Sequence, residues 1–180
     1  MVRLFVCIWM PDEIKSDILK FQEKMKFLPM KAKFVEENNM HLTITFLGDV
    51  KSDDLNKIKS KLDKISGFGE FHVKLSNLKV LPSENYIRVI GIDVVDEENK
   101  MKDLIKFVGS EIGGSYHEQT KMTLCRVKSI DNKKSVKQFI DKNRNINFGD
   151  FIAKEVSLVK STLTKTGPIY ETVYKVKLNG

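Results

Sequence analysis

The side chains of residues 41–48, HLTITFLG, alternate between polar and apolar and include a histidine. Successive side chains of a β-strand point to opposite faces. The alternation therefore predicts a strand with His41, Thr43 and Thr45 on one face and apolar residues on the other. Because an imidazole with an ordinary pKa gives and takes protons at neutral pH, the polar face predicts a site for acid–base chemistry.

A second segment, residues 121–126, repeats this pattern as KMTLCR. Thr123 lies two residues after the start of its segment, as Thr43 does in the first copy. Lys121 stands where the first copy has His41. Two strands of one pattern predict a single site built from two copies, with different chemical groups at the first position.

The composition indicates a folded chain that attracts anions. Of its 180 residues, 41% are hydrophobic and 31% are charged, and the formal net charge is +7. Lysines close to phosphates release condensed counterions, so a basic chain favours polyanionic partners such as RNA. Only four of the 31 basic residues are arginines, whose planar forks suit phosphate, and one of them, Arg126, ends the second segment. We therefore expect Arg126 to bind phosphate.

Several classes of protein are excluded by the pattern of residues. The longest apolar run, residues 4–10, is much shorter than the roughly 20 residues of a membrane helix. Cys7 and Cys125 fall in predicted strands, which indicates buried, reduced thiols, and no spacing of Cys and His is typical of a metal site. We therefore expect a cytoplasmic protein with no membrane contact, no metal and no cofactor, and take a monomer as the default.

Helices and strands of regular spacing surround the two segments. Apolar residues at helical spacing predict helices over about residues 12–28, 52–65, 100–112 and 133–143. β-branched and aromatic runs predict strands over about residues 2–10, 33–36, 41–47, 71–81, 86–95, 121–127, 151–161 and 171–178. The order strand, helix, motif strand, helix occurs twice. We expect one α+β domain over residues 1–180, with two intertwined, pseudo-symmetric lobes, each an antiparallel sheet with helices outside. The motif strands of the two lobes then face a central cleft.

Four segments of the chain resemble the 2H phosphoesterase family, in its RNA 2′,3′-cyclic phosphodiesterase branch, also called 2′-5′ RNA ligases. They occur in the family's order over nearly the whole length. A single His-x-Thr motif is common by chance, whereas four ordered segments are specific. The segments are RLFV at 3–6 with Pro11, HLTITFLG at 41–48, TLCRVK at 123–128, and the closing residues 157–171 with their GPIYE end.

The resemblance implies a reaction without metal in an open cleft between two lobes. One histidine would protonate the leaving 3′ oxygen of an RNA 2′,3′-cyclic phosphate while the second activates water, leaving a 2′-phosphate. By this resemblance His41 is the general acid, and Thr43 and Thr123 donate hydrogen bonds to the phosphate in the transition state. Arg126 would bind phosphate or ribose. The implied partner is RNA with such an end, for example a tRNA fragment, and the reverse reaction would be 2′-5′ ligation.

Phe46 receives two interpretations. By resemblance it occupies the position after the first motif, where it would stack on a base. By strand alternation it lies on the face opposite to His41, which predicts an ordinary core phenylalanine.

Lys121 departs from the family, which has its second histidine there. An ammonium with a pKa of about 10.4 cannot accept a proton at neutral pH. In one interpretation Lys121 acts electrostatically and the enzyme is slow, since base assistance is worth about 10²–10⁴ in rate. In another His117 substitutes, although four residues span about 13 Å along a strand and a bend would be needed. In a third the lysine is a deliberate, inactivating change.

Three functions follow from these interpretations. The leading hypothesis is an RNA 2′,3′-cyclic phosphodiesterase, weakened at Lys121. A non-catalytic RNA-end-binding protein on the same fold is the alternative that Lys121 favours. A phosphodiesterase acting on a small cyclic nucleotide is the third, although lysine-rich helices beside the cleft favour RNA.

Overall fold

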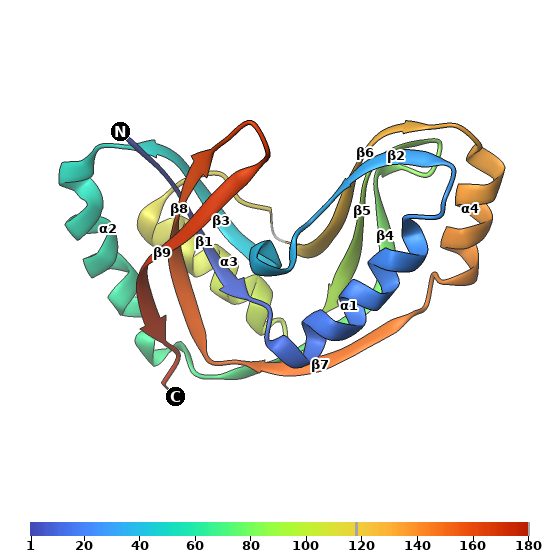
Figure 1. The fold of residues 1–180 in the computed structure, drawn as a ribbon. Coiled ribbons are helices and arrows are strands. Elements are labelled where there is room, and N and C mark those ends of the chain that lie inside the picture. The colour runs from blue at the N-terminus through green and yellow to red at the C-terminus, as the bar shows by residue number, and fades with distance from the viewer. Residues whose placement is uncertain (118, 180) are drawn as a thin grey trace.

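The computed structural model describes residues 1–117 and 119–179, which form nine strands and four α-helices (Figure 1). The strands are β1 (Val2–Trp9), β2 (Met30–Phe34), β3 (His41–Val50), β4 (Phe71–Ser83), β5 (Tyr86–Val95), β6 (Lys121–Ile130), β7 (Asn147–Ala153), β8 (Glu155–Leu163) and β9 (Pro168–Lys177). The α-helices are α1 (Asp12–Met25), α2 (Leu55–Leu62), α3 (Lys100–Ile112) and α4 (Lys133–Lys142). Three short 3-10 helices are η1 (Glu37–Asn39), η2 (Ser52–Asp54) and η3 (Asp63–Phe68).

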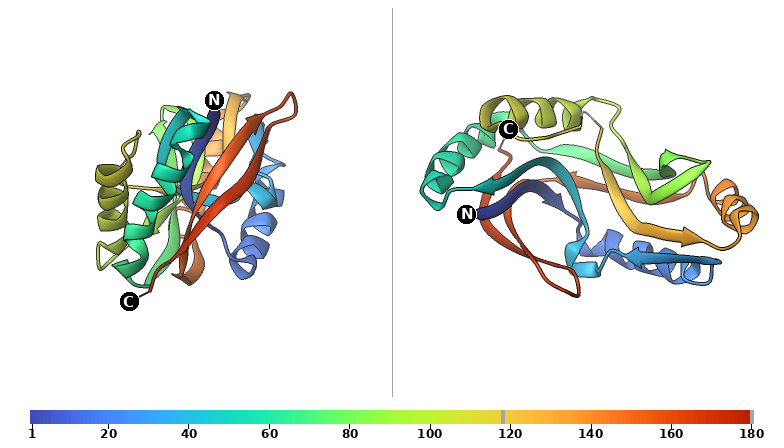
Figure 2. Two further views of the ribbon diagram at one scale, coloured as in Figure 1. Left: turned by 90° about the vertical axis from the view of Figure 1, so that its left-hand side faces the viewer. Right: turned by 90° about the horizontal axis from the view of Figure 1, so that it is seen from above.

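All strands belong to one antiparallel sheet that divides into two lobes between β3 and β6. The order is β7-β4-β5-β6-β3-β1-β8-β9, with β2 added to β6, and a single residue pair, Leu42 with Met122, joins β3 to β6. Helices α2 and α3 lie outside the lobe of β1, β3, β8 and β9, and α1 and α4 lie outside the other lobe (Figures 1 and 2). The predicted α+β class, with antiparallel strands and outer helices, is confirmed.

Each lobe contains segments from both halves of the chain. Helix α1 precedes β3 in the sequence but packs against β7, whereas α3 precedes β6 but packs against β3. The single strand predicted over residues 151–161 is wrong, because β7 and β8 are separate strands in different lobes. Strand β7 pairs with β4 and β8 pairs with β1, with Lys154 between them. No turn sequence marks this passage between the lobes, so the two strands resemble one apolar run.

The apolar stripes predicted for the helices face the core. In α1, Ile14, Ile18, Phe21 and Met25 are at most 5% exposed. The helix ends at Met25, before the predicted end at residue 28. Residue 28 precedes a proline, and the residue before a proline is disfavoured in the helical conformation. The predicted helix over residues 52–65 is α2 flanked by the 3-10 helices η2 and η3.

Both motif strands contain a β-bulge at the same position. The pairing of β3 with β1 slips beside Ile44, and the pairing of β6 with β5 slips beside Leu124, so neither residue has a partner in that neighbouring strand. A bulge adds one residue to one strand, so the alternation of faces shifts by one beyond it. The first six residues of the two strands accordingly share one burial pattern, in which the fourth and fifth are both buried.

The bulge in β3 reverses two expectations based on strand alternation. Alternation places Thr45 on the polar face with His41, but Thr45 is fully buried and its hydroxyl donates to the carbonyls of Gly113 and Ser115, each at 3.3 Å. Alternation also places Phe46 in the core, but this residue is 51% exposed. Both expectations are wrong because the alternation of polar and apolar residues in the sequence does not reveal the extra residue of a β-bulge.

Gln22 of α1 lies in the core and donates a hydrogen bond to the backbone of the bulge in β6. This side chain is 2% exposed, and its Nε2 donates to the carbonyl oxygens of Val35, at 2.9 Å, and Leu124, at 3.0 Å. The carbonyl of Leu124 also accepts from the backbone N–H of Val35 at 3.0 Å. Buried polar groups need such partners, so Gln22 stabilises the irregular backbone on which the end of the motif depends.

Replacing Gln22 by Met should lower the free energy of unfolding by about 1–3 kcal/mol. Methionine has a shape similar to that of glutamine, but the buried carbonyl groups of Val35 and Leu124 lose their hydrogen-bond donor. Urea denaturation measures the change. Gln138→Met, on the exposed face of α4, is the matched control and should stay within about 0.5 kcal/mol of the unmodified chain. Equal effects of the two substitutions would contradict the role of Gln22.

Candidate active site

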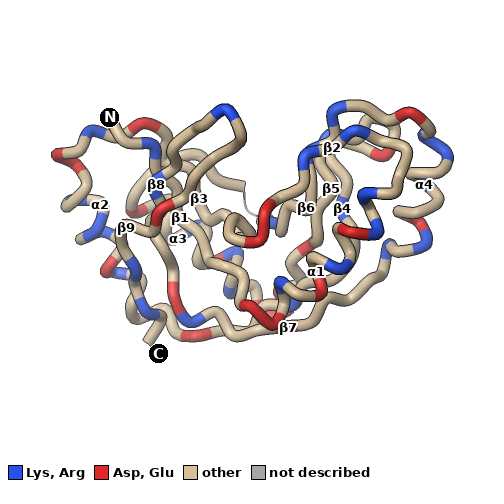
Figure 3. The backbone as a smooth tube through the Cα atoms, viewed as in Figure 1, with Lys and Arg blue, Asp and Glu red and all other residues tan. Residues whose placement is uncertain are grey.

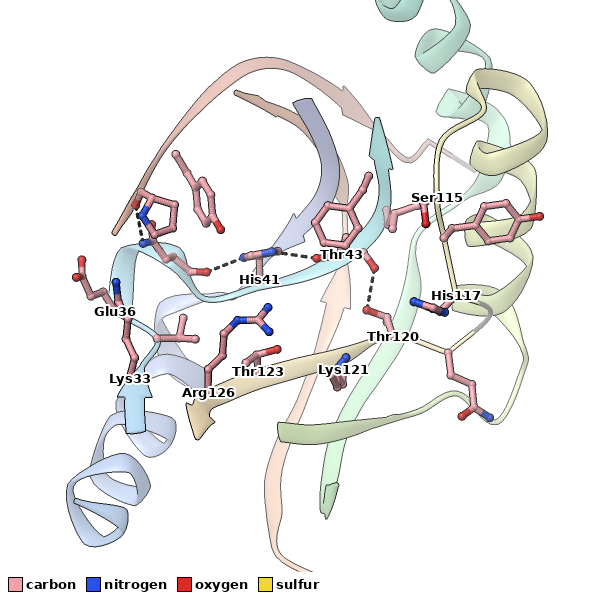
Figure 4. Close-up of a pocket in the computed structure, with 18 of the residues that line it drawn as sticks. Lys33, Glu36, His41, Thr43, Ser115, His117, Thr120, Lys121, Thr123 and Arg126 are labelled. Atoms are coloured by element: carbon pink, nitrogen blue, oxygen red, sulfur yellow. Dashed lines mark hydrogen bonds between the residues drawn. The ribbon is translucent and has the colours of Figure 1, made fainter. Parts of the chain in front are cut away.

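A cavity of about 410 Å³ lies where β3 and β6 meet (Figure 4). Each motif strand lines it with its first, third and sixth residues, because the bulge in each strand turns the sixth residue toward the cleft. These residues are His41, Thr43 and Phe46 from β3, and Lys121, Thr123 and Arg126 from β6, and Ile44 of β3 also contributes to the lining. The structure therefore brings all six predicted site residues together.

His41 is held with its Nε2 toward Thr43 (Figure 4). Its Nδ1 lies 2.6 Å from the carbonyl oxygen of Asn39, which can only accept, so Nδ1 carries a proton. Its Nε2 lies 3.0 Å from Thr43 Oγ1. In the neutral imidazole the Thr43 hydroxyl donates to Nε2, so His41 presents an unprotonated nitrogen at the cavity.

Aromatic rings enclose His41. The ring centroids of Phe5, Trp9 and Tyr170 lie 5.1, 5.7 and 5.5 Å from that of the imidazole. Burial among them disfavours the charged form and lowers the pKa of His41 below its ordinary value of 6.5, while the hydrogen bond to Asn39 opposes this shift. The imidazole is therefore mainly neutral at pH 7 in the free protein.

Lys121 lies half-buried across the cavity from His41 (Figure 4). Burial, followed by the positive charges of Arg126 and Lys79, lowers the pKa of Lys121 below its ordinary value of 10.5, and Asp93 acts in the opposite direction. Asp93 is the strand neighbour of Lys121 but lies 3.2 Å from the Lys79 ammonium. The surroundings thus make the Lys121 ammonium a stronger acid than a free lysine.

The loop between α3 and β6 forms a further wall of the cavity. Gly113 and Gly114 have φ values of +85° and +98°, which favour glycine, and a Cβ on Gly114 would lie 2.5 Å from the carbonyl oxygen of Phe46. His117, which follows this bend, also lines the cavity (Figure 4). A contribution from His117 in place of the second histidine stays a prediction.

Three residues that position the predicted ones have little or no signal in the sequence. Asn39 acts through its backbone carbonyl, so no side-chain signal could identify it. Thr120 donates from its hydroxyl to the carbonyl of Thr43 at 2.8 Å and so ties the start of β6 to β3. Tyr170 packs on His41 from the β8–β9 hairpin. It lies in the closing segment that carries the family resemblance, which is the one signal that could have identified it.

The two cysteines lie outside this chemistry. Cys7 and Cys125 are buried free thiols, as predicted, and burial raises the pKa of Cys125 to about 12 and that of Cys7 further. Within residues 1–117 and 119–179, no group of three or more His, Cys, Asp and Glu side chains could hold a metal ion. Over the same residues, no helix is long and apolar enough to cross a membrane.

Comparison with known sequences assigns this fold and cavity to a class of phosphoesterase. Residues 8–91, which include β3, match the LigT like Phosphoesterase family. The RNA 2′,3′-cyclic phosphodiesterase of Methanocaldococcus jannaschii is 38% identical over 177 residues, covering 96% of this chain and 98% of the relative. The protein of the same name from Methanothermobacter thermautotrophicus is 30% identical over 175 residues, covering 94% and 95%. The chain therefore belongs to the LigT-like phosphoesterase family, and the predicted membership of the 2H phosphoesterases is confirmed.

Solved structures share the two-lobed fold. Escherichia coli LigT complexed with 3′-AMP superposes with a TM-score of 0.80 and 21% identity over 99% of each chain. A protein of Thermus thermophilus superposes with a TM-score of 0.81 and 21% identity over 99% of this chain and 98% of its own. At these identities the likeness concerns the fold, whereas the full-length sequence relatives identify the chain as an enzyme of the phosphoesterase class.

Proposed function

We propose that the chain is an RNA 2′,3′-cyclic phosphodiesterase that opens the cyclic phosphate to a 2′-phosphate without a metal ion. The observation that carries the proposal is the placement of His41 and Lys121 on opposite sides of one cavity that Thr43, Thr123 and Arg126 also line. The names of the relatives from Methanocaldococcus and Methanothermobacter support this choice of substrate.

Opening a cyclic phosphate requires a base for the attacking water and an acid for the leaving oxygen. If His41 is the acid, as the family resemblance implies, the Lys121 ammonium cannot be the base. If the two roles are exchanged, each of the two residues can perform its role. Nε2 of neutral His41 accepts a proton from water, and Lys121 donates one to O3′. The lowered pKa values of both groups favour this division, so we assign His41 as general base and Lys121 as general acid.

In this step the water oxygen forms a bond to phosphorus while the bond from phosphorus to O3′ breaks. Arg126 supplies a planar fork for the non-bridging phosphate oxygens. The hydroxyls of Thr43 and Thr123 donate to the same oxygens as their charge increases. Thr43 turns from His41 Nε2 to the phosphate when substrate binds, which frees the nitrogen for water. If a 5′-hydroxyl replaced water as the nucleophile, the same groups would form a 2′-5′ linkage while the bond from phosphorus to O3′ breaks and O3′ is protonated.

Phe46 provides the base contact in this proposal. Its ring is 51% exposed in the lining of the cavity and lies 6.2 Å from the ring of Phe5. Unpaired RNA bases stack on exposed aromatic rings. We therefore place the terminal base of the RNA against Phe46.

Turnover of a short RNA ending in a 2′,3′-cyclic phosphate tests the proposed function. The unmodified chain should form a 2′-phosphate in the presence of EDTA, and His41→Ala should lower kcat by about 10²–10⁴ because general-base assistance is lost. His72→Ala, at an exposed histidine outside the cavity, is the control and should retain activity. Dependence on metal, or an active His41→Ala, would contradict the proposal. Tight RNA binding without turnover would support the RNA-end-binding alternative, and turnover of cyclic mononucleotides alone would support the small-nucleotide alternative.

The pH dependence tests the exchanged roles. Because His41 must be unprotonated, kcat/KM should rise with pH through a pKa below 6.5, and because Lys121 must be protonated, it should fall through a pKa below 10.5. Lys121→His should raise kcat about tenfold or more near pH 6, since an acid with a pKa close to the working pH is more effective. It should also move the fall at high pH to near neutrality.

Two results of the pH measurements would contradict these roles. If kcat/KM of Lys121→His rises through neutral pH without a fall, the introduced histidine acts as a base and His41 as the acid. If His117→Ala removes the fall at high pH in the otherwise unmodified chain, His117 donates the proton in place of Lys121.

A further inference from the structure

A second cavity, of about 650 Å³, lies beside α4 at the outer end of the lobe that contains β6. The turn between β4 and β5, the end of β6 and the first turns of α4 surround it. We call this cavity the basic groove, because five of its lining residues are basic and Lys and Arg gather where β2, β6 and α4 approach one another (Figure 3). The five residues are Arg88, Lys128, Lys133, Lys134 and Lys137.

The positive charge of the basic groove is largely uncompensated. Its one acidic lining residue, Glu84, lies 2.7 Å from Arg144, which is outside the lining. Within residues 1–117 and 119–179, none of the four lysines of the groove forms an ion pair. Because like charges gathered around a cavity repel one another, an anionic ligand would be stabilised there.

Tyr86 and Arg88 form a flat surface in the lining of the groove. The Arg88 guanidinium lies over the Tyr86 ring at 4.7 Å from its centroid, and Nε donates to the Tyr86 hydroxyl at 2.7 Å. A second nitrogen of Arg88 donates to the carbonyl of Lys128 at 3.3 Å, which fixes the guanidinium on β6. Tyr86 is 55% exposed. Aromatic rings and guanidinium planes are surfaces on which unpaired bases stack, so the groove suits single-stranded RNA better than an acidic peptide.

Strand β6 connects the basic groove with the active-site cavity. Arg126 lines the cavity, and Lys128, two residues and about 7 Å further along the strand, lines the groove. From Lys121 to Lys128 the strand spans about 23 Å. A 2′,3′-cyclic phosphate occupies the 3′ end of an RNA, so every other nucleotide lies on its 5′ side. An RNA strand that leaves the cavity along β6 would therefore bring its 5′ side to the groove.

We propose that the basic groove binds the phosphates of the RNA strand on the 5′ side of the reactive end. This inference rests on the proposed function for the identity of the ligand. The groove then sets the length of RNA that the enzyme prefers, while the active-site cavity holds only the terminal nucleotide and its cyclic phosphate.

Neutralising two lysines of the groove tests the proposal by binding, independently of turnover. Lys134→Gln/Lys137→Gln removes two exposed lysines of α4, and Lys51→Gln/Lys57→Gln, beside and on α2 in the other lobe, is the control with the same change in charge. The probe is a fluorescent RNA of about ten nucleotides that ends in a 2′-phosphate and is not turned over. Loss of two phosphate contacts should raise its Kd roughly 25-fold at 0.1 M salt, and should reduce the slope of log K against log salt by about 1.4. The control should change Kd less than twofold.

Turnover of cytidine 2′,3′-cyclic monophosphate separates the groove from the active site, because this substrate is too short to reach the groove. Both double variants should turn it over as the unmodified chain does. Three results would overturn the proposal: an unchanged Kd in the groove variant, an equal loss in the control, or a parallel loss of mononucleotide turnover. Equal competition by a poly-glutamate peptide of the same charge would identify an acidic protein as the partner instead. If RNA binds through the groove while neither substrate is turned over, the groove stands and the proposed function fails.

Discussion

The β-bulges beside Ile44 and Leu124 are the constraint on which the active site depends. Each places two consecutive residues in the core and so turns the next one, Phe46 or Arg126, into the cleft. A regular strand would send that side chain to the opposite face. The two bulges therefore convert a pattern of alternate residues into two sets of three that line one cavity. The buried amide of Gln22 stabilises one of these irregular segments by donating to the carbonyl of Leu124.

Similar backbones on the two sides of the cleft carry different surroundings, and these surroundings determine the chemistry. Burial among aromatic rings favours a neutral imidazole at His41, whereas burial and then the positive charges of Arg126 and Lys79 lower the pKa of Lys121 and make its ammonium a stronger acid. A single histidine then suffices, because the proton acceptor and the proton donor need not be the same kind of residue. In the mechanism that we propose, Lys121 is the general acid, and the difference between the two motifs supplies the two catalytic roles.

Much of the fold and part of the site could be predicted from the sequence. Periodicity identified the helices and the motif strands, and the alternation placed His41 and Thr43 on one face, because neither feature depends on distant parts of the chain. Alternation failed at Thr45 and Phe46, since a bulge depends on how the neighbouring strand pairs. It also failed at the junction of β7 and β8, because a passage between lobes requires no particular sequence. Arg126 was identified by the scarcity of arginine and by family resemblance, while its position in the cavity follows from the bulge.

A crystal structure of the protein with bound inorganic phosphate tests most directly whether the paired bulges aim both motif strands at one phosphate. We expect the phosphate to lie between His41 Nε2 and Lys121 Nζ, within hydrogen-bonding distance of the Thr43 and Thr123 hydroxyls and of Arg126. In that complex the Thr43 hydroxyl should have turned away from His41. Phosphate bound elsewhere, or a Lys121 ammonium directed away from it, would contradict the account.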